Sequence, residues 1–168
     1  MPLRGEKIIP ESVYIALDAR SEPGTYHYGL LITGLEGGGT LHHAVNRSGS
    51  WIYETRPAYP RLPISLVAMI RIGDLSNDDN EHIMEVIRSV PADGKPSQRT
   101  GEVFNCTTWL KDVLVALEEA GVVRLPMRIE ALFRVAKAYG DLHSEEAELG
   151  RGIYVVNETN SKVVEFWC

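Results

Sequence analysis

Apolar and polar residues alternate along the first part of the chain, and this pattern predicts strands. Residues 12–19 (SVYIALDA) place Val13, Ile15 and Leu17 on one side, as in a half-buried strand. The run 64–72 (ISLVAMIRI) is apolar enough for a central strand that is buried on both faces. Four or five consecutive strands imply an antiparallel sheet, with members over 12–19, 26–33, 40–46, 48–57 and 64–72.

In the second part of the chain, apolar residues recur at spacings of three and four, which predicts helices. The stretch 76–90 has Ser76 or Asn77 as a capping residue, acidic residues in its first turn and one apolar side. Further helices are expected over 104–121 and 127–140. The segments 91–102 and 143–152 are polar, have no period and are expected to be loops.

These elements suit one domain over 1–168. The chain has 168 residues, of which 44% are hydrophobic and 24% charged, and this is enough to bury a core. The predicted fold is α+β, an antiparallel β-sheet meander packed against about three helices. Its parts are an N-terminal arm (1–11), the meander (12–72), a helical part (76–140) and a C-terminal β-hairpin (152–168).

Charge and hydropathy exclude several kinds of partner. The chain has 23 acidic and 17 basic residues, and its net charge of -6 leaves no basic footprint for a nucleic acid. No segment approaches the roughly 20 apolar residues of a membrane span, and the N-terminus lacks the apolar core of a signal peptide. We therefore expect a cytoplasmic protein that binds neither nucleic acid nor membrane.

Cys106 lies in the first turn of the helix that Asn105 begins. The backbone N–H groups of this turn have no partner within the helix and favour negative charge, so the thiolate form is favoured here. Trp109 and Val113 follow on the same helix face, which directs the sulfur into the protein. We expect Cys106 and Cys168 to be reduced, because a disulfide would consume this candidate nucleophile.

Histidines on two neighbouring strands could supply the base that a thiolate nucleophile needs. His27 lies near the start of one strand, and hairpin pairing would bring His42 or His43 of the next strand beside it. Because side chains alternate, only one of the two can join His27. His43 shares its face with Leu41 and Val45, the apolar side that should meet the helices, and is preferred. His42 is the alternative.

The segments HYGLLITG, LHHAV and NCTTWL resemble the permuted papain-like fold of the lecithin:retinol acyltransferase and NlpC-type thiol enzymes, in which histidine precedes cysteine. The resemblance covers about residues 12–120. It implies Cys106 as nucleophile, His27 as base and His43, or else His42, as the residue that orients the base. The run HHAVNRSGSWIYE…FNCTTWLKDVL also resembles small fungal-type proteins.

Two further patterns imitate ligand sites but lack a required residue. In DLSNDDNEHIME, Asp79 stands where a calcium loop needs glycine for its turn. The GLEGGG run is not followed by Lys-Ser/Thr, so it does not predict a phosphate-binding loop. We therefore expect neither a metal nor a cofactor.

Together the patterns predict a cysteine-dependent hydrolase or acyltransferase that acts on an amide, ester or thioester carbonyl of a small molecule or peptide. In this hypothesis a Cys106 thiolate is paired with His27 as imidazolium. The alternatives are a binding module without turnover and a biosynthetic tailoring or cyclising enzyme that uses the same cleft. The candidate substrate-binding residues are Asn105, His42, Trp51 and Trp109.

Overall fold

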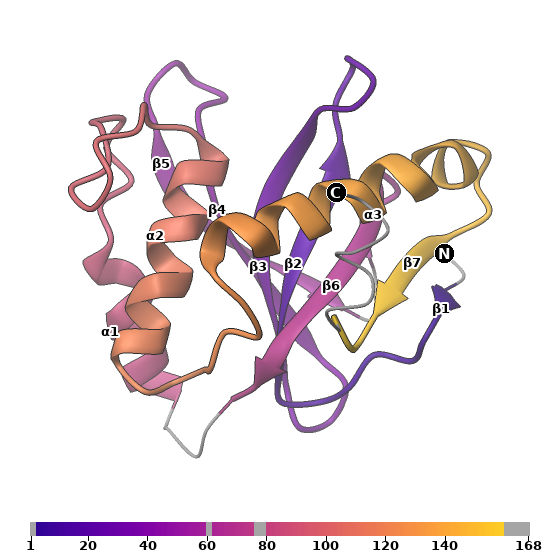
Figure 1. The fold of residues 1–168 in the computed structure, drawn as a ribbon, viewed down its shortest axis with the longest axis horizontal. Helices are drawn as coiled ribbons and strands as arrows, with labels where there is room; N and C mark the ends of the chain where they lie inside the picture. The colour runs from indigo at the N-terminus through magenta and orange to yellow at the C-terminus, as the bar shows by residue number, and fades with distance from the viewer. Residues whose placement is uncertain (1–2, 60–61, 76–79, 160–168) are drawn as a thin grey trace.

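The computed structural model describes residues 3–59, 62–75 and 80–159. In this part of the chain, seven strands form one sheet and three helices pack against it, which confirms an α+β fold (Figure 1). None of the described helices is both long enough and apolar enough to cross a membrane. The strands are β1 (Leu3–Gly5), β2 (Ser12–Ala19), β3 (Tyr26–Thr33), β4 (Gly39–Val45), β5 (Ile52–Tyr59), β6 (Leu66–Asp74) and β7 (Ile153–Val156). The helices are α1 (Asn80–Ser89), α2 (Cys106–Glu119) and α3 (Ile129–Glu148).

Strands β2 to β5 form the antiparallel meander that the sequence predicts, because each pairs with its neighbour along the chain. Strand β6 then pairs with the other side of β2, which gives the order β1-β7-β6-β2-β3-β4-β5. Strand β7 is parallel to both β6 and β1, so the sheet as a whole is mixed, with antiparallel pairing from β6 through β2 to β5. Parallel neighbours require a long crossover, and the helices between β6 and β7 provide it.

Both ends of the chain also differ from expectation. The arm 1–11 contains β1, which pairs with β7. Residues 153–156 form a strand, but this strand is enclosed between β6 and β1 instead of forming an edge hairpin. The rest of the expected hairpin, 160–168, lies outside the described residues, as do the expected capping residues Ser76 and Asn77.

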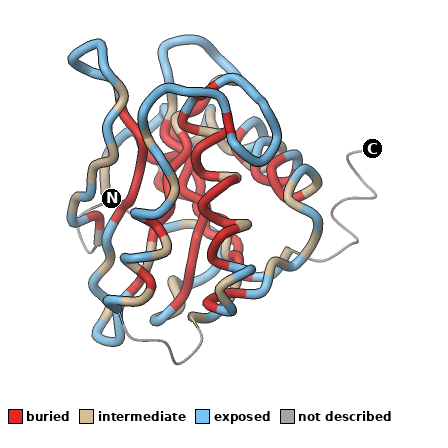
Figure 2. The backbone as a smooth tube through the Cα atoms, turned by 90° about the vertical axis from the view of Figure 1, so that its left-hand side faces the viewer, coloured by how far each residue is buried: buried red, intermediate tan, exposed pale blue. Residues whose placement is uncertain are grey.

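The two faces of the sheet are covered by different elements. The helices cover one face, the helix face, where Leu30 belongs to the main apolar core. The opposite face, the far face, has a smaller apolar cluster that includes Tyr14 and Leu41, and Ile8 and Leu62 pack against this cluster. Strand β2 lies between β3 and β6 and is buried on both faces. The strand is where the sequence predicts it, but the prediction that it is only half-buried is wrong. Figure 2 shows that the buried segments lie in the interior of the molecule and that most of the connecting loops are exposed.

Helix α3 is longer than the sequence pattern indicates, because it continues to Glu148 through most of the loop expected over 143–152. His143 in this extension stacks on Tyr154 of β7, with ring centroids 3.6 Å apart. Contacts with a distant strand thus extend a helix whose apolar period has already ended.

Helix α3 approaches β2 and β3 closely at Gly140. A Cβ added there would lie 2.8 Å from Leu17 Cδ2 and 2.9 Å from Tyr26 Cζ. Alanine in place of glycine inside a helix normally stabilises by about 1 kcal/mol, but overpacking a core destabilises by about 1–3 kcal/mol. We expect Gly140→Ala to lower the free energy of unfolding in urea by about 1 kcal/mol. Gly38→Ala is the control, because a Cβ there meets nothing within 4 Å. A stabilised Gly140→Ala protein would contradict this packing.

Candidate active site

The alternation of β3 decides which side chains meet the helices. The Tyr28 ring lies 5.6 Å from the ring of Phe133 on α3, and the Tyr26 hydroxyl donates a hydrogen bond of 2.8 Å to Asp141 on the same helix. His27 lies between these tyrosines, so its side chain leaves the strand on the far face. Cys106 belongs to the core of the helix face. The candidate base and the candidate nucleophile therefore lie on opposite faces of the sheet.

On the far face, His27, His43 and Glu54 form a continuous hydrogen-bonded chain. His27 Nε2 lies 2.9 Å from His43 Nδ1, and His43 Nε2 lies 2.9 Å from Glu54 Oε2. The register of β4 and β5 places His43 directly opposite Glu54, so the sheet itself fixes the second of these bonds. Arg47 holds the carboxylate from its other side through bonds of 3.0 and 2.8 Å to the two oxygens. The hydrogen-bonded chain thus runs from a paired carboxylate to a partly buried imidazole.

The charge state of Glu54 determines which nitrogen donates and which accepts in each of these hydrogen bonds. Burial raises the pKa of Glu54, but hydrogen bonds and charges from Arg47 and His43 outweigh burial and hold the pKa below its ordinary value. The ionised carboxylate only accepts hydrogen bonds, so His43 Nε2 carries a proton and His43 Nδ1 is an acceptor. His27 Nε2 must then donate to His43. In this tautomer, the second nitrogen of His27, Nδ1, holds a free lone pair.

His27 is a neutral imidazole at pH 7. Burial, followed by electrostatic interactions with His43 and with the positive charges of Arg20, Arg56 and Arg47, lowers the pKa of His27 to about 4. The predicted imidazolium of His27 is therefore wrong for the resting protein. A neutral imidazole is the form that can accept a proton, so His27 Nδ1 can act as a base.

Cys106 is the first residue of α2, as the sequence predicts. Asn105 caps the helix, since its side-chain oxygen accepts a bond of 2.8 Å from the Thr108 backbone N–H. The thiol is only 3% exposed, and its sulfur accepts a hydrogen bond of 3.4 Å from Arg20 Nη2. Among the described residues no histidine is bonded to this sulfur. The predicted contact between Cys106 and His27 is thus not formed, because the sheet separates them.

His43, and not His42, is the partner of His27, but the reason given for this choice is wrong. The side of β4 that carries Leu41 meets the far-face cluster and not the helices. His42 instead faces the helices, and its Nδ1 lies 2.7 Å from the Tyr53 hydroxyl. An apolar neighbourhood does not identify the helix face here, because both faces of the sheet are apolar.

The predicted substrate-binding residues have structural roles in this conformation. Trp109 is 1% exposed and packs on Tyr53, with ring centroids 5.8 Å apart. Trp51 packs edge-on against Phe104 at 5.0 Å. Burial, the electrostatic interaction with His43 and the positive charge of Arg88 lower the pKa of the enclosed His42 to about 4. Of the four predicted residues only the helix cap, Asn105, is exposed.

Two functional candidates, Glu54 and Arg20, were not found from the sequence. Glu54 could have been found by pairing 40–46 with 52–58 as a hairpin, since that register sets it opposite His43. Arg20 lies in the turn after β2 and reaches Cys106 over 86 positions of sequence. No local signal marks such a contact.

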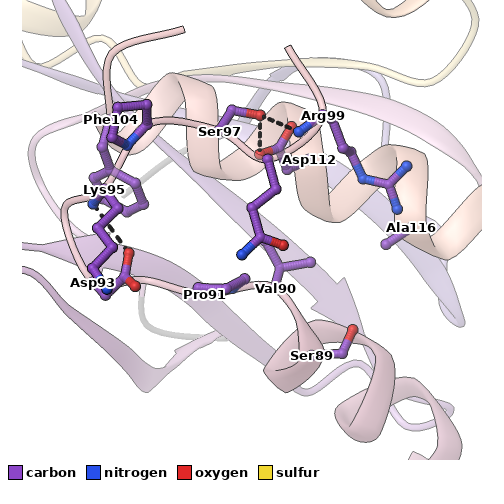
Figure 3. Close-up of a pocket in the computed structure, with 12 residues that line it drawn as sticks. Ser89, Val90, Pro91, Asp93, Lys95, Ser97, Arg99, Phe104, Asp112 and Ala116 are labelled. Atoms are coloured by element: carbon purple, nitrogen blue, oxygen red, sulfur yellow. Dashed lines mark hydrogen bonds between the residues drawn. The ribbon is translucent and has the colours of Figure 1, made fainter. Parts of the chain in front are cut away.

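A pocket of about 250 Å³ lies between the end of α1, the loop over 91–102 and α2 (Figure 3). Neither Cys106 nor the three residues of the His27–His43–Glu54 chain line it. At its inner wall the Ser97 hydroxyl donates a bond of 2.7 Å to Asp112. The same hydroxyl accepts bonds from the backbone of Arg99 and Thr100, which shows how it orders the loop. In the described part of the chain, no group of three or more His, Cys, Asp or Glu side chains could hold a metal ion.

The fold and site define an α+β protein with a histidine–histidine–glutamate chain on one face of its sheet and a buried thiol on the other. Residues 13–124, more than half of the chain, match the family of unknown function DUF6540, and the protein belongs to this family. No curated protein and no solved structure matches the chain.

Two histidines, the buried His42 and the partly buried His27, make stability depend on pH. Folding lowers the pKa values of His27 and His42 from 6.5 to about 4, so the unfolded chain binds more protons between these values. Their contribution to stability is complete above pH 6.5 and is lost as the pH falls toward 4. Urea midpoints should therefore fall over this range, and they should fall less in His42→Phe. Tyr53→Phe, which keeps the titrating imidazole, should retain the wild-type slope. Equal slopes in wild type and His42→Phe would contradict the assignment.

The bond from Arg20 should control the reactivity of Cys106. A guanidinium donor stabilises an anionic sulfur, and a hydrogen bond to a charged group contributes about 1.5 kcal/mol, equivalent to about tenfold in rate. We expect Arg20→Met to slow the alkylation of Cys106 by iodoacetamide at pH 7 by this factor. Arg20→Lys, which keeps the charge, should slow it less. Mass spectrometry of the Cys106 peptide measures both rates, and an unchanged rate in Arg20→Met would refute the role of Arg20.

Proposed function

We propose that this protein is a hydrolase acting on an amide, ester or thioester carbonyl of a small molecule or peptide in the cytoplasm. Its general base in this proposal is His27. The observation that carries the proposal is the hydrogen-bonded chain from Glu54 through His43 to His27, which leaves His27 Nδ1 unprotonated at the less buried end. A base oriented by a second group and supported by a carboxylate is the arrangement that general-base catalysis requires.

The proposed reaction follows from the unprotonated state of His27 Nδ1. His27 Nδ1 accepts a proton from a water molecule as the water oxygen bonds to the carbonyl carbon. The His27 imidazolium formed in this step is stabilised by Glu54 through His43, without a change in the hydrogen-bonding pattern. The imidazolium then returns its proton to the leaving oxygen, nitrogen or sulfur as the bond to the carbonyl carbon breaks. The products are a carboxylic acid and an alcohol, amine or thiol.

A second candidate is acyl transfer through Cys106. It is favoured by the bond from Arg20 Nη2 to the sulfur and by the position of the sulfur at the start of α2. Because the sheet separates this thiol from His27, such a reaction would have to proceed without His27 as its base. The permuted papain-like relationship stays part of the proposal, supported by the pairing of His27 with His43 and by the order of histidine and cysteine along the chain.

The activity test compares His27→Gln with Cys106→Ala on p-nitrophenyl esters, p-nitroanilides and thioesters. Glutamine can still donate a hydrogen bond to His43 Nδ1 but cannot accept a proton, so His27→Gln isolates the basic function. We expect His27→Gln to lower kcat/KM by about 10²–10⁴-fold, the usual contribution of a general base. Cys106→Ala should retain most of the activity.

The remaining outcomes separate the alternatives. Loss of activity in Cys106→Ala together with retention in His27→Gln would replace this proposal by the thiol mechanism. Turnover unaffected by either substitution would remove both centres from the chemistry. Circular dichroism of each variant serves as the folding control.

A further inference from the structure

Arg56 is a positive charge on the far face that has no bonded partner among the described residues. It lies on β5 opposite Leu41, a member of the far-face cluster, and two residues beyond Glu54. Its Nε is buried and makes no hydrogen bond to the part of the chain that the structure describes. Within residues 3–59, 62–75 and 80–159, its guanidinium has neither an ion pair nor a hydrogen-bond acceptor. An unsatisfied buried donor destabilises a protein by about 1–3 kcal/mol, so such a group needs an explanation.

The neighbouring arginines differ from Arg56 because their charges are already engaged. Arg47 binds both carboxylate oxygens of Glu54. Arg20 donates to the sulfur of Cys106. Arg56 alone of these three arginines keeps its donors free, although its charge acts on both His27 and His43. The far face therefore offers a positive charge two residues along β5 from Glu54, the carboxylate end of the hydrogen-bonded chain, in a protein of net charge -6.

On the other side of His27, β2 presents a negative charge. Asp18 pairs with His27 in the register of β2 and β3 and is only 6% exposed. One of its oxygens accepts a bond of 2.7 Å from Ser65, and the other, Oδ2, is buried and has no hydrogen-bond partner among the described residues. The face is thus polarised across His27, with a free acceptor toward β2 and a free donor toward β5.

We propose that Arg56 binds a carboxylate or phosphate group of the substrate on the far face of the sheet, the face that carries His27, so that the substrate class is anionic. This inference rests on the proposed hydrolase function and specifies its substrate. A planar guanidinium binds either oxyanion through paired hydrogen bonds. The polarity of the face sets the orientation, because Asp18 repels the anionic end and can accept a hydrogen bond from a hydroxyl or amide N–H at the other end.

Anion binding at Arg56 also has a consequence for the base. The positive charge of Arg56 is one of the causes that hold the pKa of His27 at about 4. A bound anion offsets this charge and so raises the pKa of His27. The substrate would then strengthen the base that attacks it, whereas a neutral ester would leave the base weak.

The test measures binding of two simple anions without turnover. Sulfate represents the phosphate type and succinate the carboxylate type, and the ring resonances of His27 and His43 report binding by NMR. In wild-type protein we expect saturable shifts of these resonances with at least one of the two anions. Arg56→Gln should weaken that binding at least tenfold, and Arg56→Lys should weaken it less because the charge remains. The anion that binds more tightly shows whether the anionic group of the substrate is of the phosphate type or the carboxylate type.

A matched control and a second variant make the result decisive. Arg134→Gln removes an equal charge from an exposed position of α3, on the other side of the sheet, and should leave binding unchanged. His27→Gln should still bind the anion, now reported by His43, so failure of the hydrolase proposal and failure of this inference give different results. Equal binding by wild type and Arg56→Gln, or no saturable shift with either anion, would overturn the inference.

Discussion

The alternation of side chains along β3 is the constraint on which the rest of the site depends. Tyr26 and Tyr28 are anchored to α3, one by a hydrogen bond to Asp141 and the other by packing on Phe133. Once these two rings face the helices, His27 between them must face away. A one-residue shift of register would exchange the two faces, but it would bury an imidazole against α3 and expel two tyrosines from the core.

This constraint separates two chemistries that the sequence suggests should cooperate. The thiol of Cys106 lies on the helix face, where its sulfur accepts a hydrogen bond from Arg20. The imidazole stays on the far face, where the pairing of β4 with β5 supplies a second imidazole and a carboxylate in line. The local surroundings also differ, since His27 is kept neutral by burial and by neighbouring cations. Burial thus keeps the base available at neutral pH but makes it weak, and Glu54 compensates by stabilising the protonated form through His43.

Local patterns in the sequence are sufficient for much of the fold. They predict the strands of the meander, the cap at Asn105 and the start of α2, because these depend on residues within a few positions of one another. They also predict that His27 has a histidine neighbour on the next strand. Glu54 completes the chain on a third strand, and its place depends on a register that only the folded sheet fixes.

The sequence fails where distant segments decide the outcome. Leu41 is as apolar as a helix-facing residue, yet the segments around Ile8 and Leu62 cover it instead. For the same reason β2 is buried on both faces although its pattern suggests one. Likewise, the parallel insertion of β7 and the reach of Arg20 to Cys106 join positions far apart in the chain. A periodicity shows that a side is apolar but not what will cover it.

The protonation pattern of the two imidazole rings tests the direction of the chain most directly. Long-range proton–nitrogen correlation NMR at pH 7 distinguishes the two nitrogens of each ring. The arrangement from Glu54 to His27 predicts that both His43 and His27 are neutral, protonated at Nε2 and unprotonated at Nδ1. A His27 ring protonated at Nδ1, or on both nitrogens, would contradict it, because Nδ1, the nitrogen that does not face His43, would then have no lone pair to accept a proton from the attacking water.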